Sequence, residues 1–264
     1  GVGGFRRAGP DTAQPSYVEA DQRWFDKFAI NLFRAGMVRA IGEDVRTPGY
    51  PGLMELALKL NRRFPPGETR RRTRGILASF FPPFILKLFP VMFAGPFPAF
   101  SAKLNAAITA ATCRWLMGPI EVVDVPAEEL LAGWGDGVGQ GLQVERCRFL
   151  EESGCASVCI NTCKVPTQEF FVKDMGIPLT MEPDYETFAC KFSFGKAPLQ
   201  QEVDEVFATA CFAQCPSKGS LRAAHAPQGC DALMQDSTYD PRVPPPEVFW
   251  AGVKDMFGLS PKSK

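Results

Sequence analysis

Residues 147–195 read CRFLEESGCASVCINTCKVPTQEFFVKDMGIPLTMEPDYETFACKFSFG, and this segment holds the most informative pattern of the sequence. Within it, ESGCASVCINTCKVPTQEFFVKDMG reads as a helix that is interrupted at Pro166, since proline removes an internal hydrogen bond. Cys155, Cys159 and Cys163 follow one another at intervals of four residues. A helix turns by about 100° per residue, so we expect these three sulfurs to share one face.

Cysteine is concentrated around this predicted helix at a density that core packing does not require. The lone Cys113 lies in an alanine-rich stretch, where we expect it to act as a small buried hydrophobic residue. Cys211 and Cys215 form a second pair, at a spacing of four and followed by Pro216. The eight clustered cysteines are Cys147, Cys155, Cys159, Cys163, Cys190, Cys211, Cys215 and Cys230.

Several thiol chemistries compete for this cluster. Disulfides between positions i and i+4 of one helix face have poor geometry. Structural zinc sites usually place cysteine pairs on turns rather than along a helix. Iron–sulfur sites accept flexible spacing, and a cysteine followed by proline recurs in them. The spacing favours an iron–sulfur site and leaves zinc, redox thiols and disulfides as alternatives.

The near absence of histidine excludes several other chemistries. The single histidine, His225, stands in a loop-like AAHAPQ context. An oxygenase centre with two histidines and a carboxylate, or a centre with several histidines, cannot be built from this chain. A serine hydrolase would need His225 and has no nucleophile elbow to match it. Thiolate chemistry remains, with or without iron.

Upstream of the cysteines the sequence is predominantly helical. Residues 17–42 predict an amphipathic helix, and a turn at Thr47-Pro48-Gly49 precedes a second one. A segment rich in Phe and Pro covers residues 80–100, and residues 101–117 predict a tightly packed helix. The prolines of the segment at residues 80–100 argue against one straight membrane span. The Arg run in residues 62–74 beside it suits either an anionic membrane surface or a solvated face next to buried helices.

After Pro119 the pattern changes to short strands. IEVVDV, QVERCRF and FACKFSF (near residues 188–194) predict three strands, and the intervening GWGDGVGQG predicts a mobile hairpin loop. The glycine spacing in this loop is only weak evidence for a dinucleotide-binding site, because no long apolar helix follows it. The fold class is therefore α+β, with a helical N-terminal half and a small antiparallel sheet beside the Cys-bearing helix.

Four regions follow from these patterns. They are residues 1–16, disordered or the remnant of a transit peptide; 17–118, helical; 119–230, Cys-rich; and 231–264, a Pro-rich tail with an amphipathic helix. Lys and Arg number 29, as do Asp and Glu, so net charge gives no reason to expect a nucleic-acid partner.

Residues 147–195, followed by CFAQCP at 211–216, resemble the C-terminal domain of the plant β-carotene isomerases of strigolactone biosynthesis. PGLMELALKL and NAAITAATCRWLMGP also look like that family, so the resemblance spans roughly residues 20–216. The tail from residue 217 and the Phe and Pro run at residues 80–100 depart from the family pattern.

The resemblance implies a plastid protein that contains iron and interconverts all-trans- and 9-cis-β-carotene. The Phe and Pro segment with its Arg neighbours adds the expectation that this protein is membrane-associated. The matched cysteines, which become candidates for the iron or iron–sulfur site, are Cys147, Cys155, Cys159, Cys163, Cys190, Cys211 and Cys215. Rotation about a double bond requires a lowered bond order, which electron exchange with a cluster or addition of a low-pKa thiolate would supply.

Two further expectations concern the hydrocarbon and its surroundings. Five phenylalanines are candidates to line the entry of a rod-like carotenoid, although packing of the helical half explains them equally well: Phe80, Phe81, Phe84, Phe89 and Phe93. The alternative to an enzyme is a non-catalytic pigment-binding or scaffolding subunit of a photosynthetic membrane complex, with the Phe and Pro segment and the terminal helix as docking surfaces.

Overall fold

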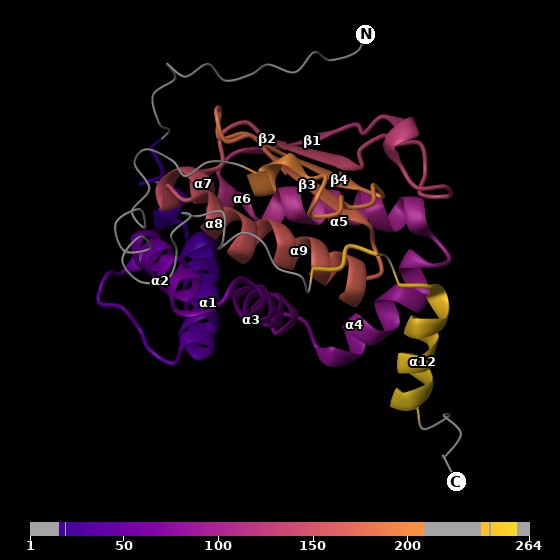
Figure 1. Ribbon diagram of the computed structural model, residues 1–264, viewed down its shortest axis with the longest axis horizontal. Coiled ribbons are helices and arrows are strands. Elements are labelled where there is room, and N and C mark those ends of the chain that lie inside the picture. The colour runs from indigo at the N-terminus through magenta and orange to yellow at the C-terminus, as the bar shows by residue number, and fades with distance from the viewer. Residues whose placement is uncertain (1–15, 19, 209–238, 243, 258–264) are drawn as a thin grey trace.

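The architecture is α+β, as the sequence predicted. The computed structural model describes residues 16–18, 20–208, 239–242 and 244–257. Cys211, Cys215 and Cys230 lie outside the described residues, as does nearly all of the predicted disordered or transit segment. In Figure 1 the sheet lies above two helical layers, with α5 and the Cys-bearing helix directly beneath it and α1 to α4 below them.

The N-terminal half consists of helices, several of which begin at proline. Pro66, Pro83 and Pro98 each occupy the first position of a helix, where the missing N–H costs nothing. The prolines at residues 80–100 therefore divide that segment into consecutive short helices instead of leaving it without regular structure. The elements are η1 Ala20–Gln22, α1 Trp24–Ile41, α2 Gly49–Arg63, α3 Pro66–Ala78, α4 Pro83–Phe89, the π-helical η2 Pro90–Ala94, α5 Pro98–Thr112 and α6 Arg114–Met117.

The C-terminal half carries one antiparallel sheet with the strand order β1-β2-β4-β3. Its elements are β1 Ile120–Val123, η3 Ala127–Glu129, β2 Gly141–Val144, α7 Arg148–Ser153, α8 Ala156–Cys159, η4 Ile160–Lys164, α9 Val165–Glu169, η5 Phe170–Asp174, β3 Leu179–Pro183, β4 Cys190–Phe194, η6 Glu205–Ala208 and α12 Pro246–Met256. Residues of both halves belong to one hydrophobic core, which includes Leu56 of α2 and Phe192 of β4.

Several predicted boundaries were wrong. The first helix begins at Trp24, because Arg23 is extended. The strand predicted for QVERCRF ends at Val144, and Arg148 already belongs to α7. The strand β3 was not predicted because it contains a proline, Pro183, which an edge strand tolerates. The glycine-rich loop does connect an antiparallel pair, and the buried Gln140 anchors it by donating to Trp134 O (2.8 Å) and Phe194 O (3.1 Å).

The Cys-bearing helix is continuous from Ala156 to Asp174, and we call it the central helix. The predicted interruption at Pro166 was wrong. The π-helical segments η4 and η5 flank the turn that holds this proline, and widened turns of this kind accommodate an irregularity without ending a helix.

A stripe of buried polar side chains fixes the rotation of the central helix. Ser157, Asn161, Lys164 and Gln168 recur at helical spacing and are each at most 1% exposed. Asn161 accepts a hydrogen bond from Arg70 Nε of α3 (2.8 Å) and donates to Asn61 Oδ1 of α2 (3.2 Å). We call these four residues the polar stripe.

The second half of the polar stripe contacts the sheet and the segment after it. Lys164 donates to Met181 O of β3 and forms an ion pair with Asp204 (2.7 Å). Gln168 accepts a hydrogen bond from the Met181 amide (2.8 Å) and donates to the Tyr239 hydroxyl (3.0 Å). The polar stripe thus joins the central helix to both neighbouring layers.

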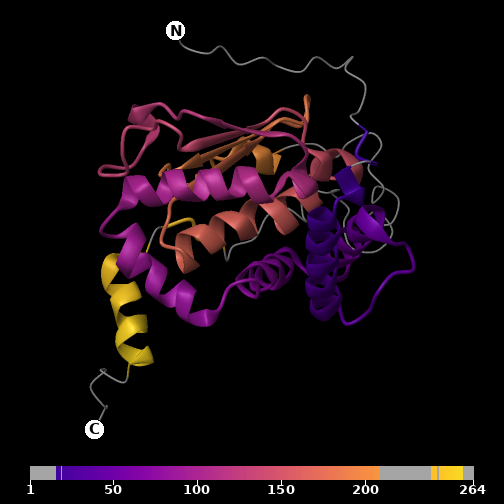
Figure 2. The same ribbon diagram turned by 180° about the vertical axis from the view of Figure 1, so that it is seen from behind.

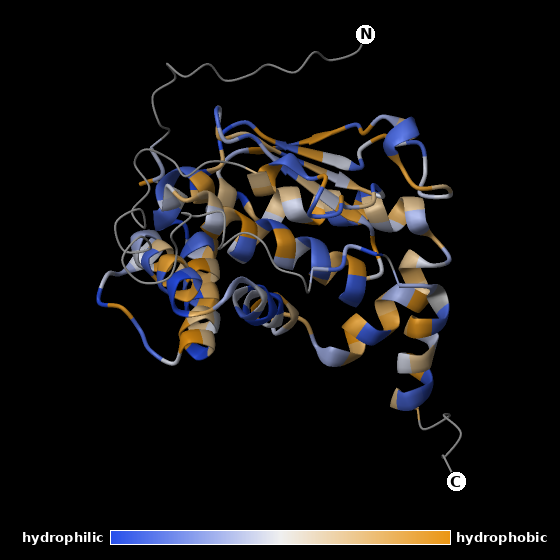
Figure 3. Ribbon diagram, viewed as in Figure 1, coloured by the Kyte–Doolittle hydropathy of each residue, from blue (hydrophilic) through white to orange (hydrophobic). Residues whose placement is uncertain are grey.

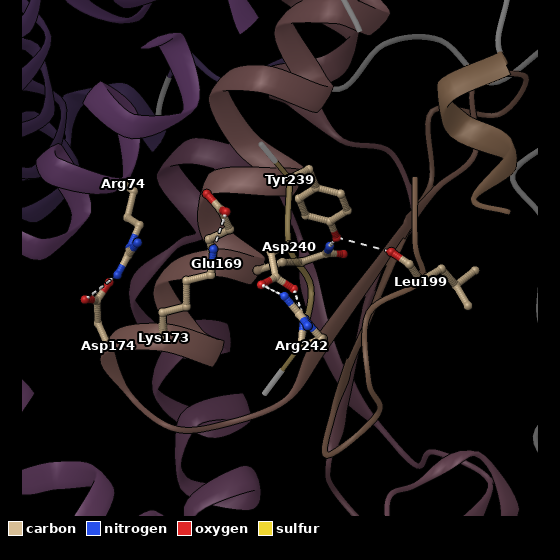
Figure 4. A network of polar contacts seen from close by, with 9 residues as sticks. Arg74, Glu169, Lys173, Asp174, Leu199, Tyr239, Asp240 and Arg242 are labelled. Carbon is tan, nitrogen blue, oxygen red and sulfur yellow. Dashed lines mark hydrogen bonds and ion pairs between the residues drawn. The ribbon is translucent and has the colours of Figure 1, made fainter. Parts of the chain in front are cut away.

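The end of the central helix is held by polar contacts that Figure 4 shows at close range. Arg74 of α3 forms a two-pronged ion pair with Asp174 (2.7 and 2.9 Å), and Lys173 pairs with Glu169 (2.7 Å). Tyr239 donates to Leu199 O (3.3 Å) and so brings the tail back to this region. The terminal helix α12 then packs against α4 and η2 of its own chain.

The arginines of α3 mostly serve this internal framework. Arg70 is buried, Arg72 pairs with Glu68 (2.6 Å), and Arg74 pairs with Asp174. Within the described residues no single helix is long and apolar enough to cross a bilayer. The pair Pro66–Ala78 and Pro83–Ala94 passes by length and composition, but it is bent by 97°.

Replacing Asn161 by leucine is expected to lower the free energy of unfolding by about 3 kcal/mol, because Arg70 and Asn61 lose buried hydrogen-bond partners. Asn31→Leu, on the exposed face of α1, is the matched control and should change it by less than about 0.5 kcal/mol. Urea unfolding followed by circular dichroism measures both. Equal effects of the two variants would show that the polar stripe does not stabilise the fold.

Candidate functional site

Four of the predicted cysteines come together around one small cavity. Cys147 precedes α7, Cys159 belongs to α8, Cys163 to η4 and Cys190 to β4. Their side chains line a cavity of about 10 Å³ together with Lys164 and apolar residues of the core. We call it the thiol cavity.

The other predicted cysteines do not line this cavity. Cys155 is buried, but it is the extended residue that precedes α8, so the expected face of three sulfurs is limited to Cys159 and Cys163. Cys113, expected to be buried, is partly exposed and lines a different pocket. The pair Cys211 and Cys215 lies outside the described residues.

Burial keeps the thiols of the cavity neutral. Loss of hydration raises the pKa of Cys147 to about 11, although backbone hydrogen bonds from Leu150 and Phe149 oppose the shift. Burial raises the pKa of Cys159 to about 12, against the opposing effects of Tyr185 and Lys164. The pKa values of Cys163 and Cys190 also lie well above the ordinary value, again because of burial. None of the four favours a thiolate near neutral pH.

The predicted iron–sulfur cluster does not fit the thiol cavity in this structure. Among the described residues, no three His, Cys, Asp or Glu side chains are placed to hold a metal ion. A cavity of about 10 Å³ is of the size that admits a single water molecule, whereas a cluster also brings inorganic sulfide.

A much larger pocket lies beside the thiol cavity. It has a volume of about 470 Å³, and none of the described residues that line it is charged. Its few polar side chains are satisfied locally: Asn105 donates to Ser101 O (2.8 Å) and Thr112 to Ile108 O (2.8 Å). We call it the apolar pocket.

Three of the five predicted phenylalanines line the apolar pocket: Phe80, Phe81 and Phe89. Phe84 and Phe93 do not, and both are exposed. Phe93 stacks on Phe89 with ring centroids 5.3 Å apart, so it supports the wall from outside.

Most of the pocket wall was missed by sequence reasoning, because it comes from helices far apart in the chain. In Figure 2, α5 runs beneath the sheet, with α1 at one side and α4 below. The amphipathic pattern of residues 17–42 was the one available signal, and it predicts only a helix with one apolar face. The unpredicted aromatic and long aliphatic lining includes Phe25, Phe28, Leu32, Phe33, Leu77, Ile85, Leu104, Ile108, Trp115, Leu116, Phe170, Phe171 and Phe192.

The two cavities share a wall, and Cys163 is the thiol in it. Met117, Cys163, Met181 and Phe192 line both the apolar pocket and the thiol cavity. Met117, Met181 and Phe192 are at most 4% exposed, so the pocket is blind at this end. The arrangement can hold a long hydrocarbon with one end against a neutral thiol, and the described residues that line the apolar pocket include no charged group that could exchange a proton.

Iodoacetamide at pH 8 is expected to modify Cys147 and Cys159 at least about a hundredfold more slowly in the folded protein than in urea, because only thiolates react. A pKa of about 11 leaves roughly one thiolate in a thousand at that pH. Since the folded pKa values are raised, labelling should accelerate about tenfold per pH unit from pH 8 to 10. Peptide mass spectrometry measures each site, and fast labelling of the folded protein at pH 8 would contradict a closed, neutral cavity.

Comparisons with known proteins agree with the resemblance noted above. The family model described as "Beta-carotene isomerase D27-like, C-terminal" matches residues 115–203. A chloroplastic beta-carotene isomerase D27 of Arabidopsis thaliana is 30% identical over 220 residues, which cover 81% of this chain and 79% of that protein. Its counterpart of the same name in Medicago truncatula is 29% identical over 79% of each chain. No solved structure matches. This chain belongs to the beta-carotene isomerase D27 family.

Proposed function

We propose that the protein is a chloroplast carotenoid isomerase that interconverts 9-cis- and all-trans-β-carotene in the apolar pocket. One observation carries the proposal: a pocket of about 470 Å³, with no charged residue among its described lining residues, ends at the partly exposed thiol of Cys163. A hydrocarbon offers no polar group to bind, so a site for it needs shape and apolar surface alone. The names of the two relatives supply the substrate and the compartment.

The chain's own residues hold the polyene and stabilise charge on it. Rotation about a double bond requires a lowered bond order, and a polyene that is polarised as it twists carries partial positive charge on one side of that bond and partial negative charge on the other. Aromatic faces attract cations, and this attraction is strongest where water is excluded. Phe170 stacks on Phe81 (5.5 Å) and meets Phe171 edge-on (5.4 Å), so the pocket presents oriented rings around the hydrocarbon.

Direct addition of a thiolate is the less favoured route. Such addition needs a low-pKa cysteine, whereas burial raises the pKa of both Cys163 and Cys113, the two thiols of the pocket wall. Isomerisation moves no proton and is redox-neutral overall, so the absence of charged groups among the described lining residues is no handicap. We assign Cys163 to the inner end of the substrate.

Iron remains a prediction that the described cysteines do not by themselves accommodate. Cys211 and Cys215 belong to the predicted ligand set and lie outside the described residues. Iron and acid-labile sulfide content of anaerobically purified protein, together with its visible spectrum, tests the prediction directly.

The proposed activity is tested by incubating the protein with each β-carotene isomer in detergent micelles and separating the isomers by chromatography. A changed isomer ratio supports the isomerase. Bound carotenoid whose geometry stays untouched would instead support the alternative, a pigment-binding or scaffolding subunit of a photosynthetic complex. Failure to bind carotenoid at all would contradict both.

Filling the pocket should abolish the activity. Thr109 of α5 is half-buried and lines the apolar pocket, so Thr109→Phe places a ring where the hydrocarbon would lie. We expect carotenoid affinity and conversion to fall at least about tenfold, since an overfilled site costs more than about 1.4 kcal/mol. Ala107→Phe, on the exposed side of the same helix, is the control and should leave both unchanged. Equal conversion by the two variants would place the substrate elsewhere.

Two serine variants separate the pocket thiol from the rest of the predicted ligand set. Cys163→Ser is expected to lower conversion by about a hundredfold with carotenoid binding retained, because the inner end of the pocket becomes polar and loses its sulfur. Cys155→Ser should remain active, because Cys155 precedes α8 at a position where serine is favoured. Loss of both activity and bound iron in Cys155→Ser would favour a cluster that includes Cys155.

A further inference from the structure

A group of exposed apolar side chains surrounds the mouth of the apolar pocket. Phe28, Leu32, Phe81 and Ile108 line the pocket, yet all four are exposed, so the pocket opens between them. Trp24, which is 80% exposed, and Phe84, which is 55% exposed, extend the same elements. We call these six residues the mouth face.

The elements of the mouth face leave an unusual amount of apolar surface uncovered. The helix α4 has the sequence PFILKLF, and none of its seven residues is buried. Figure 3 shows it mostly in the hydrophobic colour. The terminal helix α12 packs against α4, but this contact does not bury any residue of α4. Contiguous exposed apolar surface of this kind marks a docking site.

The exposed charges of α1, α4 and α5, the helices that carry the mouth face, have one sign, whereas α12, which packs against α4, adds the exposed acids Glu247 and Asp255. Between Glu68 and Glu121 the sequence contains no acidic residue, and this interval supplies α4 and α5. On α1 the first acidic residue, Asp26, is buried. The exposed cations beside the face are Arg23, Lys27, Lys87 and Arg114. Apolar side chains ringed by cations complement an anionic lipid surface, where each nearby cation contributes about 1 kcal/mol.

We propose that the mouth face docks on an anionic lipid bilayer, with its aromatic side chains in the headgroup region and the pocket open to the acyl chains. The inference rests on the proposed function in one respect: a hydrocarbon substrate dissolved in the bilayer then enters the pocket without crossing water. Docking itself requires only the mouth face and its cations. The other occupant that this surface would suit is a second copy of the chain.

The test is sedimentation of the full chain with vesicles, without carotenoid. Binding is expected for vesicles of phosphatidylcholine with one third phosphatidylglycerol, and it should weaken with added salt and on pure phosphatidylcholine. Trp24→Asp should weaken binding at least about tenfold, because an anchoring aromatic ring is replaced by a negative charge that the anionic lipid repels. The variant is compatible with folding, since Trp24 is exposed and an acid is favoured in the first turn of α1.

Val122→Asp is the matched control, because Val122 is exposed on β1, in the sheet layer on the other side of the molecule from α1 and α4 (Figure 1). It should bind vesicles as the unchanged protein does. Lack of binding by the unchanged protein, or equal binding by Trp24→Asp, would overturn the proposal. A dimer that dissociates in Trp24→Asp would assign the face to a second copy instead.

Failure of the docking proposal and failure of the proposed isomerase activity can be told apart. Trp24 does not line the pocket, so Trp24→Asp should convert carotenoid in detergent micelles at the ordinary rate and lose conversion only when the carotenoid is supplied in vesicles. Vesicle binding without conversion in either medium would leave the docking face standing and remove the isomerase. Conversion in micelles without vesicle binding would support the isomerase and contradict the docking face.

Discussion

The polar stripe of the central helix is the constraint on which the rest of the structure depends. A helix enclosed between a sheet and a second helical layer cannot bury Ser157, Asn161, Lys164 and Gln168 unless each finds a partner. Those partners are fixed in α2, α3 and β3, so the helix has one rotation that satisfies them. That rotation directs Cys159 and Cys163 into the thiol cavity and Phe170 and Phe171 into the apolar pocket.

The same enclosure sets the chemistry of the site. Thiols that lose their hydration without a dedicated cation stay protonated, and Lys164, the cation that lines the thiol cavity, is already paired with Asp204. The result is an interior with neutral thiols at one end and aromatic rings along its length. Such an interior suits a substrate without polar groups and offers little to one that must exchange protons.

The sequence allowed the α+β class, the Cys-bearing helix and two of the four strands to be predicted closely, because each depends on a local pattern. The errors arose where tertiary contacts override that pattern: Pro166 lies inside a continuous helix, and Pro183 ends an edge strand. The sequence analysis named Cys147, Cys159, Cys163 and Cys190 among the candidate metal ligands, but it did not predict that these four line one cavity. The apolar pocket could not be predicted from the sequence, because its wall combines residues of helices as far apart in the chain as α1 and α5. Hydrophobic periodicity indicates which face of a helix is apolar, but not which other helix that face contacts.

The blind inner end of the apolar pocket has a consequence for the order of events. In the proposed binding mode a rod-shaped molecule has one end against Met117, Met181 and Phe192 while the other remains outside. For a substrate made of two identical halves, one visit therefore exposes one half to the site. The second half is reached only after the molecule has left, turned end for end and entered again. If the proposed function is right, we expect the protein to be distributive, with singly altered products released before any doubly altered ones form.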